Sequence, residues 1–315
     1  MTAFLFPGQG SQRPGMLSVE GLCQETLEEA ETFLASRADL PSFADLDSVD
    51  GLARSSNAQL ALLIAGTACA RALLKRGVPD PDVVAGHSVG ACSAAVLAGA
   101  LLFTEALDTV ALRASEMERV CAAGRWGMTA VDGVDARTAE AVAREVGSAQ
   151  DPLWVANVNS RRQVVFSGSW GALNALDLAA EHAGAQRVRR LGVSVASHGA
   201  LLKPVRDALA DHLAAVPPRP LRAAYLTNTR GRRTQDSHAV LADLIESVAQ
   251  PVQWRTIAEI LPELGVTHAV EMLPGDVLTR LTDSPDIHVM STADLGLITT
   301  MHRLTRSRRS RGPSR

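Results

Sequence analysis

The chain has 315 residues, of which 46% are hydrophobic, so it is long enough for one large α/β domain or for one domain that carries a smaller insert. Its formal net charge is −3, and six arginines lie in the last thirteen residues, so the body is acidic and lacks the basic stripe of a nucleic-acid-binding protein. The start has no signal-peptide pattern and we expect no apolar stretch to span a bilayer, which predicts a cytoplasmic protein that binds neither nucleic acid nor membrane.

The first part of the chain alternates between strand-like and helix-like runs. A short apolar run ends at Pro7, which predicts a strand followed by a loop. Asn57–Gly77 is rich in Ala and Leu and ends at a glycine, which predicts a buried helix. Asp82–Ala85 predicts a second strand, followed by a turn and a small-residue helix. Thr104–Cys121 predicts a further helix with Thr104 as its N-cap.

The pattern changes after Gly124, where strand-like and helix-like runs follow in the order β-α-β-β-α-β. That order is typical of the ferredoxin-like motif. We therefore expect an α/β fold in which residues 1–122 and 195–302 form a large subdomain and residues 123–194 a small inserted one. Residues 303–315 are rich in Arg, Ser, Gly and Pro, and we expect them to form a basic, disordered tail.

The stretch "AGHSVGACSAAVLAGAL", which begins at Ala85, places Ser88 between two glycines. A G-x-S-x-G pattern after a strand and before a helix is typical of a nucleophile elbow, a tight turn that holds the serine Oγ out of the core. The backbone N–H of Val89 would then point to where an oxyanion forms. The short pattern also arises by chance, so an ordinary serine near the start of a buried helix is the alternative.

A serine nucleophile needs a base, and eight histidines are available. His198 ends an apolar run and precedes a helix, which is where an active-site loop residue lies in an α/β fold, so we expect His198 to be the base. His87 adjoins Ser88, but the turn should direct its ring elsewhere. No acidic residue close to His198 in the sequence completes a Ser-His-Asp triad.

The sequence indicates neither a metal site nor a cofactor site. The four cysteines form no CxxC pair and have no histidine at metal-ligand spacing, so we expect free, mostly buried thiols at Cys23, Cys69, Cys92 and Cys121. The run "GQGSQRPG" could suggest a dinucleotide loop, but Arg13 stands where the third glycine should be.

Seven motifs, in order, resemble those of the malonyl-CoA:acyl-carrier-protein transacylase family over residues 3–295. They are "FPGQGSQ" at Phe6–Gln12, "GHSVG" at Gly86–Gly90, "ALRASEM" at Ala111–Met117, "VNSRRQVVFSG" at Val158–Gly168, "VASH" around Ala196, "QPVQW" at Gln250–Trp254 and "PGDVLTRL" at Pro274–Leu281. Each motif alone is weak evidence, whereas seven in family order are specific.

The resemblance implies an α/β-hydrolase-like large subdomain with a ferredoxin-like insert. It also implies a ping-pong transfer, in which Ser88 takes the malonyl group from malonyl-CoA as an ester and His198 acts as base and then as acid. The oxyanion hole would use the backbone N–H groups of Gln9 and Val89. Arg113 matches the family's arginine that binds the free carboxylate of malonate.

In the family a backbone carbonyl orients the histidine, which would explain the missing acid; here that position is Ser247, where the family usually has Asn or Gln. Val89 in place of Leu, the lack of Glu after Gly90, and the runs Asn228–Arg233 and Val270–Leu281 resemble the epsilon subunit of malonate decarboxylase. We favour that branch, which charges a carrier-protein subunit and would have other decarboxylase subunits as partners. The alternative is a malonyltransferase of fatty-acid or polyketide synthesis.

A serine thioesterase or hydrolase, in which water takes the acyl group, is the alternative from another class. For a transferase, the second partner is an acyl carrier protein, and such proteins are generally acidic. We expect the carrier to dock near the cleft between the subdomains on five arginines that cluster in the sequence, with a solvated surface as the alternative. These are Arg161, Arg162, Arg187, Arg189 and Arg190.

Overall fold

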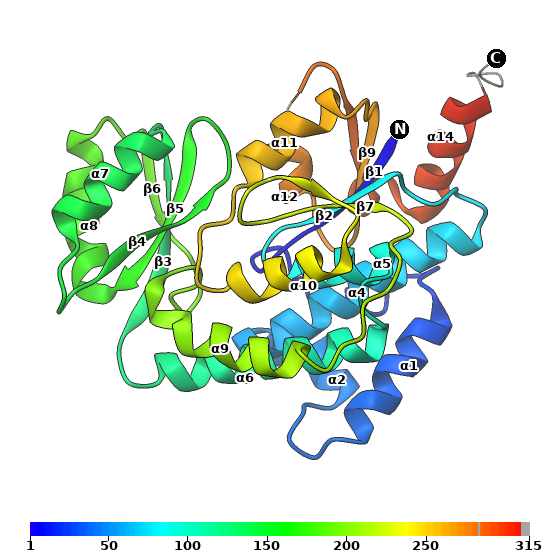
Figure 1. Cartoon of the computed structure of the whole chain (residues 1–315), viewed down its shortest axis with the longest axis horizontal. Coiled ribbons are helices and arrows are strands. Elements are labelled where there is room, and N and C mark those ends of the chain that lie inside the picture. The colour runs from blue at the N-terminus through cyan, green and yellow to red at the C-terminus, as the bar shows by residue number, and fades with distance from the viewer. Residues whose placement is uncertain (283, 310–315) are drawn as a thin grey trace.

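Two β-sheets of different kinds organise the chain, and Figure 1 shows the smaller sheet at the left end of the molecule and the larger one near its middle. The computed structural model describes residues 1–282 and 284–309, with side chains up to residue 305. The segment from β3 to β6 forms the smaller sheet, and the chain before and after it forms the larger one. The mixed α/β architecture agrees with the expectation from the sequence.

The larger sheet is parallel except for its last, two-residue strand, which pairs antiparallel to its neighbour. In spatial order its strands are β10 (His288–Ser291), β9 (His268–Glu271), β1 (Thr2–Phe6), β2 (Val83–Gly86), β7 (Ala224–Leu226) and β8 (Arg233–Thr234). Because these strands run in the same direction, the loops after β1, β2 and β7 meet at one edge of the sheet.

Helices cover both faces of the larger sheet, and β1 shows why its strands are apolar throughout. Phe4 and Phe6 contribute to a core that includes α4 and α5, whereas Ala3 and Leu5 contribute to a second core on the other face with α11.

The helices before the insert are α1 (Gln24–Ala35), α2 (Phe43–Leu46), α3 (Val49–Leu52), α4 (Ser55–Lys75), α5 (Gly90–Ala98) and α6 (Phe103–Cys121). Those after it are α9 (Lys203–Leu213, preceded by the 3₁₀ turn Ala200–Leu202), α10 (Ser237–Glu246), α11 (Trp254–Glu263), α12 (Val277–Leu281), α13 (Thr292–Leu295) and α14 (Leu297–Arg309).

The smaller sheet is antiparallel, with two helices packed on one face (Figure 1). Along the chain its elements are β3 (Trp126–Asp132), α7 (Ala136–Val146), β4 (Leu153–Val158), β5 (Gln163–Ser169), α8 (Trp170–His182) and β6 (Arg187–Arg190), and the strand order in the sheet is β4-β5-β3-β6. This is the β-α-β-β-α-β order that the sequence pattern predicts. Backbone hydrogen bonds from Val158 N to Val252 O (2.8 Å) and from Val252 N to Ala156 O (2.9 Å) tie β4 to the loop before α11.

Three details differ from the sequence expectations. Helix α4 is long and apolar enough to cross a membrane by length and composition alone, but 89% of that window is buried inside the protein, so its apolar residues serve the core. Helix α6 begins at Phe103, and its N-cap is Leu102 instead of Thr104; the carboxylate of Glu105 accepts a hydrogen bond from the Leu102 N–H. Residues 303–309 continue helix α14, so the expected disordered tail does not begin at 303, and residues 310–315 lie outside the described residues.

The four cysteines are free and buried, as the sequence predicts: Cys23, Cys69, Cys92 and Cys121. Burial raises the pKa of the Cys69 and Cys92 thiols to about 11, so both remain protonated near neutral pH. Neither thiol is therefore an activated nucleophile.

Candidate active site

Ser88 occupies the sharp turn between β2, which ends at Gly86, and α5, which begins at Gly90. Its φ angle is +54°, in the left-handed region that residues other than glycine rarely adopt. The carbonyls on this turn already accept helical hydrogen bonds, from Gly90 N to His87 O (3.0 Å) and from Ala91 N to Ser88 O (2.9 Å). The turn therefore has the strand-turn-helix geometry that the G-x-S-x-G pattern predicts, and we refer to it as the elbow.

The two glycines of the pattern permit close backbone contacts that any larger residue would prevent. A Cβ atom on Gly86 would lie 2.1 Å from the carbonyl carbon and oxygen of Gly90. A Cβ atom on Gly90 would lie 2.2 Å from the carbonyl oxygen of Phe6, the last residue of β1. The elbow can thus form only because both positions lack a side chain.

His198 lies beside the serine, although the two are 110 residues apart in the sequence: the distance from Ser88 Oγ to His198 Nε2 is 2.8 Å. The other ring nitrogen, Nδ1, is 2.5 Å from the backbone carbonyl oxygen of Ser247. A carbonyl can only accept, so Nδ1 carries the proton and Nε2 is left to accept the serine hydroxyl. The backbone of His198 is also held, with φ +62° and a hydrogen bond from its N–H to Val248 O (3.0 Å).

Burial and the nearby Arg113 guanidinium lower the pKa of His198 to about 3. The Ser247 carbonyl acts in the opposite direction and raises the pKa, because the positively charged ring donates a stronger hydrogen bond to it than the neutral ring does. The imidazole is therefore neutral at physiological pH and has a free lone pair at Nε2. A neutral ring in this orientation can remove a proton from Ser88.

Arg113 reaches the site from helix α6, and its Nη2 donates to Ser88 Oγ at 3.2 Å. Its Nη1 donates to the side-chain carbonyl of Gln59 on helix α4. Only 6% of Arg113 is exposed, and no carboxylate of the described residues lies within ion-pair distance of it. Burying a cation without a nearby anion costs free energy, and a negatively charged ligand would reduce that cost, so the site suits an anionic ligand.

Two backbone N–H groups near the serine have no acceptor among residues 1–282 and 284–309: those of Gln9, in the loop after β1, and Val89, next to Ser88. The side chain of Gln9 makes a separate contact: its carbonyl oxygen accepts a hydrogen bond from the Ser55 hydroxyl at 3.2 Å. Val89 is the residue before the first turn of α5, where the helix dipole favours negative charge.

His87 is directed away from the reacting atoms, as expected. Its Nε2 lies 3.0 Å from Asn159 Oδ1, and its ring packs against Trp254 with centroids 5.8 Å apart. Desolvation lowers the pKa of His87, so this ring too is neutral near neutral pH. The structure thus distinguishes the two histidines: His198 contacts Ser88, and His87 holds the elbow against the neighbouring elements.

The five arginines proposed for carrier docking do not all share one surface. Arg161 and Arg162, in the β4–β5 turn, and Arg189 on β6 line two adjoining hollows of about 840 and 490 Å³ between the smaller sheet and helices α11 and α12. Arg190 points the other way, because its guanidinium bonds to Thr129 and Asn174 and lies over the Trp170 ring. Arg187 lines neither hollow.

The sequence analysis assigned no role at the site to three side chains that the structure places there. Gln59 contacts Arg113, and Asn228 contacts the backbone of the elbow, while Asp243 holds Asn228. Gln59 lies inside an Ala- and Leu-rich helix, where a polar residue in an apolar run was the only available hint. Asn228 and Asp243 became recognisable only once the order of strands in the larger sheet was known.

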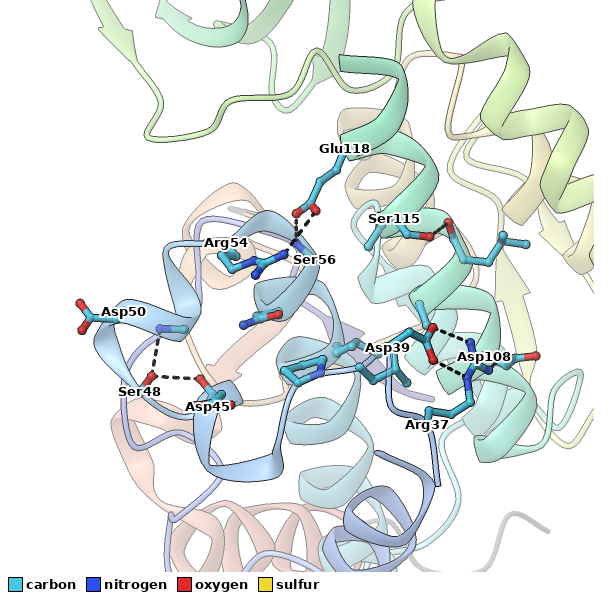
Figure 2. A pocket seen from close by; sticks show the side chains of 18 of the residues that line it. Arg37, Asp39, Asp45, Ser48, Asp50, Arg54, Ser56, Asp108, Ser115 and Glu118 are labelled. Carbon is cyan, nitrogen blue, oxygen red and sulfur yellow. Dashed lines mark hydrogen bonds and ion pairs between the residues drawn. The ribbon is translucent and has the colours of Figure 1, made fainter. Parts of the chain in front are cut away.

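A hollow of about 970 Å³ lies between the α1–α4 segment and helix α6 (Figure 2). Its charged side chains largely pair with one another: Arg37 Nη1 lies 2.7 Å from Asp108 Oδ1, and Arg54 Nη2 lies 4.0 Å from Glu118 Oε2 (Figure 2). None of the site residues predicted from the sequence lines it. By contrast, His198 lines a mainly apolar hollow of about 670 Å³ together with Trp154.

The described geometry brings a serine, a neutral histidine and a buried cation into mutual contact. Comparisons with known proteins agree: residues 3–309 match the family described as acyl transferase domain, and the chain belongs to that family. It is 36% identical to the malonyl CoA-acyl carrier protein transacylase of Salmonella typhimurium, over 89% of this chain and 91% of that protein.

Solved structures give the same result. An acyl-carrier-protein S-malonyltransferase from Burkholderia pseudomallei is 34% identical, with a TM-score of 0.87 over 96% of this chain and 99% of that one. A malonyl-transacylase solved in complex with a type II polyketide-synthase acyl-carrier protein is 31% identical, with a TM-score of 0.87 over 96% of this chain and 99% of that one. The mixed α/β fold is therefore the fold of these malonyltransferases.

The lowered pKa of His198 predicts that Ser88 remains activated in mildly acidic solution. An imidazole is a base only above its pKa, and a pKa of about 3 leaves His198 neutral well below the usual range for histidine. The rate at which a fluorophosphonate modifies Ser88 should therefore stay nearly constant from about pH 8 to about pH 5. A loss of reactivity centred near the ordinary histidine pKa, with the fold intact by circular dichroism, would contradict this.

Proposed function

We propose that this protein transfers a malonyl group from malonyl-CoA to the thiol of an acyl carrier protein. The observation that carries the proposal is Arg113, a buried guanidinium that contacts the Ser88 hydroxyl and has no carboxylate partner among the described residues. A malonyl thioester places a carboxylate two carbons from its reacting carbonyl, so the guanidinium can hold that carboxylate by two parallel hydrogen bonds while Ser88 attacks.

In the first half-reaction, Ser88 Oγ attacks the thioester carbonyl carbon while His198 Nε2 takes the hydroxyl proton. The negative charge on the carbonyl oxygen is received by the backbone N–H groups of Gln9 and Val89. The carbon–sulfur bond then breaks, and His198 returns the proton to the leaving CoA thiolate. Ser88 is left as the malonyl ester.

The second half-reaction uses the same groups in reverse. The carrier's thiol gives its proton to His198 and its sulfur attacks the ester carbonyl, after which His198 protonates the departing Ser88 oxygen. The Ser247 carbonyl keeps the imidazole in the required tautomer throughout. In both halves the malonyl carboxylate offsets the Arg113 charge that lowers the pKa of His198, which makes proton uptake by the imidazole easier.

We describe the two halves of the fold as an α/β-hydrolase-like subdomain of residues 1–122 and 195–302 and a ferredoxin-like subdomain of residues 123–194. The parallel sheet with its serine elbow supports the first description, and the antiparallel β4-β5-β3-β6 order supports the second. The cytoplasmic location stays a prediction.

The sequence leaves two classes of carrier open. The malonate decarboxylase epsilon branch, which the sequence motifs favour, rests on Val89, the residue after Gly90 and the runs 228–233 and 270–281. The similar proteins from Salmonella typhimurium and Burkholderia pseudomallei bear the names of acyl-carrier-protein malonyltransferases, and another relative was solved with a polyketide-synthase carrier. We therefore propose an acyl carrier protein of fatty-acid or polyketide synthesis as the acceptor, with the decarboxylase carrier as the alternative.

Arg162 and Arg189 are the best-placed residues for the carrier. They line a common hollow with Arg280, and neither has an acidic partner among the described residues. Arg161, in contrast, pairs with Glu259 at 3.1 Å, and Arg190 is engaged at helix α8. An acidic carrier would find two unpaired guanidinium groups at this point between the two sheets.

Ser88 should become a malonyl ester. Incubation with malonyl-CoA is expected to add one malonyl mass to the peptide that contains Ser88, and Ser88→Ala should abolish the addition. His198→Ala should slow the same step by about 10²–10⁴-fold, because the base is lost. Label that persists in the alanine variant of Ser88 would contradict the proposal. A wild-type ester lost as fast to water as to an acceptor thiol would identify a hydrolase.

Arg113→Ala should lose malonyl transfer while it keeps or gains acetyl transfer, because an acetyl group has no carboxylate to pair with the guanidinium. We expect malonyl-over-acetyl selectivity, as the ratio of kcat/KM values, to fall by about a hundredfold. Arg113→Lys should be impaired too, because an ammonium does not reproduce the two parallel hydrogen bonds. The matched control is Arg119→Ala on the same helix, an exposed arginine paired with Glu116. An equal loss with both substrates would make Arg113 a structural residue.

Charge reversal at Arg162 and Arg189 should raise the KM for the carrier and leave the KM for malonyl-CoA unchanged. The reason is that the two guanidinium groups face the proposed docking hollow and contact none of the reacting atoms. Steady-state kinetics with each substrate varied in turn measure the effect, with Arg206→Glu on α9 as the control. Unchanged carrier kinetics in the double variant would indicate a solvated arginine surface.

A further inference from the structure

The side chain of Asn228 bridges the two sides of the nucleophile elbow. Asn228 follows β7, the neighbour of β2 in the larger sheet, and it is fully buried. Its Oδ1 accepts a hydrogen bond from the Ser88 N–H at 2.9 Å, and its Nδ2 donates to the Gly86 carbonyl at 2.9 Å. One carboxamide therefore satisfies the last carbonyl of the strand and the N–H of the serine itself.

Asn228 is in turn held by a buried carboxylate. Asp243 on helix α10 is 4% exposed, and it accepts from the Asn228 N–H at 2.7 Å. The same carboxylate accepts from the Tyr225 hydroxyl at 2.9 Å and from both the N–H (3.0 Å) and the hydroxyl (2.7 Å) of Thr229. Burial and the adjacent Asp243 carboxylate raise the pKa of Tyr225, so its phenol remains a donor.

Helix α10 also holds the base. The Asp243 backbone carbonyl accepts from the Ser247 N–H at 2.9 Å, and the Ser247 carbonyl accepts from His198 Nδ1 at 2.5 Å. One turn of one helix therefore fixes the histidine through its backbone and the serine through the Asp243 carboxylate and Asn228. Any shift between α10 and the elbow would change the distance between the two reacting groups.

We propose that Asn228, anchored by Asp243, is a positioning residue that sets where Ser88 Oγ lies relative to His198. This inference rests on the proposed function only for the roles of Ser88 as nucleophile and His198 as base. The physical reason is the conformation of Ser88: at φ +54° the residue is strained, and among the described residues the Asn228 side chain is the one partner outside the elbow that forms a hydrogen bond with its backbone. Without it, the serine can relax and turn Oγ away from Nε2.

The test compares Asn228→Ala with Thr229→Ala. The first substitution removes the two side-chain hydrogen bonds to the elbow, and the second removes the hydroxyl hydrogen bond to Asp243, while both variants keep their backbone N–H bonds to that carboxylate. The readout is the rate at which a fluorophosphonate modifies Ser88, which reports the nucleophile without requiring malonyl chemistry. We expect a loss of about 10²-fold for Asn228→Ala, as for a displaced reacting group, and a near wild-type rate for Thr229→Ala. Equal rates for the two variants, both folded by thermal denaturation, would overturn the proposal.

Asn228→Asp supplies a readout that a merely structural role would not change. An ionised carboxylate can still accept from the Ser88 N–H, but it cannot donate to the Gly86 carbonyl, whereas a protonated carboxyl group can do both. The rate of Ser88 modification in this variant should therefore rise as the pH falls from about 8 to about 5, while the wild-type rate stays level. A rate that does not rise would overturn the proposal.

Fluorophosphonate labelling also separates the positioning role from malonyl transfer. A wild-type protein that reacts with the fluorophosphonate at Ser88 but not with malonyl-CoA would refute malonyl transfer and leave the role of Asn228 measurable. The opposite pattern, malonyl transfer with an Asn228→Ala rate equal to that of the control, would refute the positioning role alone.

Discussion

A residue other than glycine does not stay in the left-handed region unless its surroundings hold it there, and Ser88 is held from three sides. The strand before it, the helix after it and the end of β1 approach so closely that positions 86 and 90 have no room for a side chain. The cost of such a conformation is about 1–3 kcal/mol, which the packing of β1, β2 and α5 must offset. The strained turn places Ser88 directly before the start of helix α5.

The electrostatics of the site depend on the absence of an acid. Burial keeps His198 neutral, a backbone carbonyl takes the place of an acid behind it, and Arg113 is the charged group beside Ser88. A carboxylate hydrogen-bonded to His198 would supply a negative charge within the protein that could compensate the positive charge of Arg113. In the proposed function the malonyl carboxylate supplies the missing negative charge, and this is our physical reason for expecting a preference for a malonyl group over an acetyl group.

The order of strands in the larger sheet brings these groups together. Gln9 follows β1, Ser88 follows β2 and Asn228 follows β7, and these three strands are parallel neighbours. Residues far apart in the sequence therefore meet at the carboxyl edge of the sheet, the usual position for a ligand in an open α/β fold. The smaller sheet is tied to the larger part by the β4 backbone at Val158 and Val252, and it brings Arg162 and Arg189 toward the same region.

The sequence by itself determined the elements and the elbow, because both depend on local patterns: two glycines around Ser88, the β-α-β-β-α-β order of the insert, and the apolar run of α4. It also indicated His198 from its place between an apolar run and a helix, and Arg113 and the Ser247 carbonyl by motif resemblance. Only the tertiary structure decided that Gln59 faces Arg113, that Asn228 bridges the elbow and that Arg190 turns away from Arg189. These contacts join segments whose proximity depends on strand order and helix packing, and no local pattern of residues encodes which side chains such packing brings together.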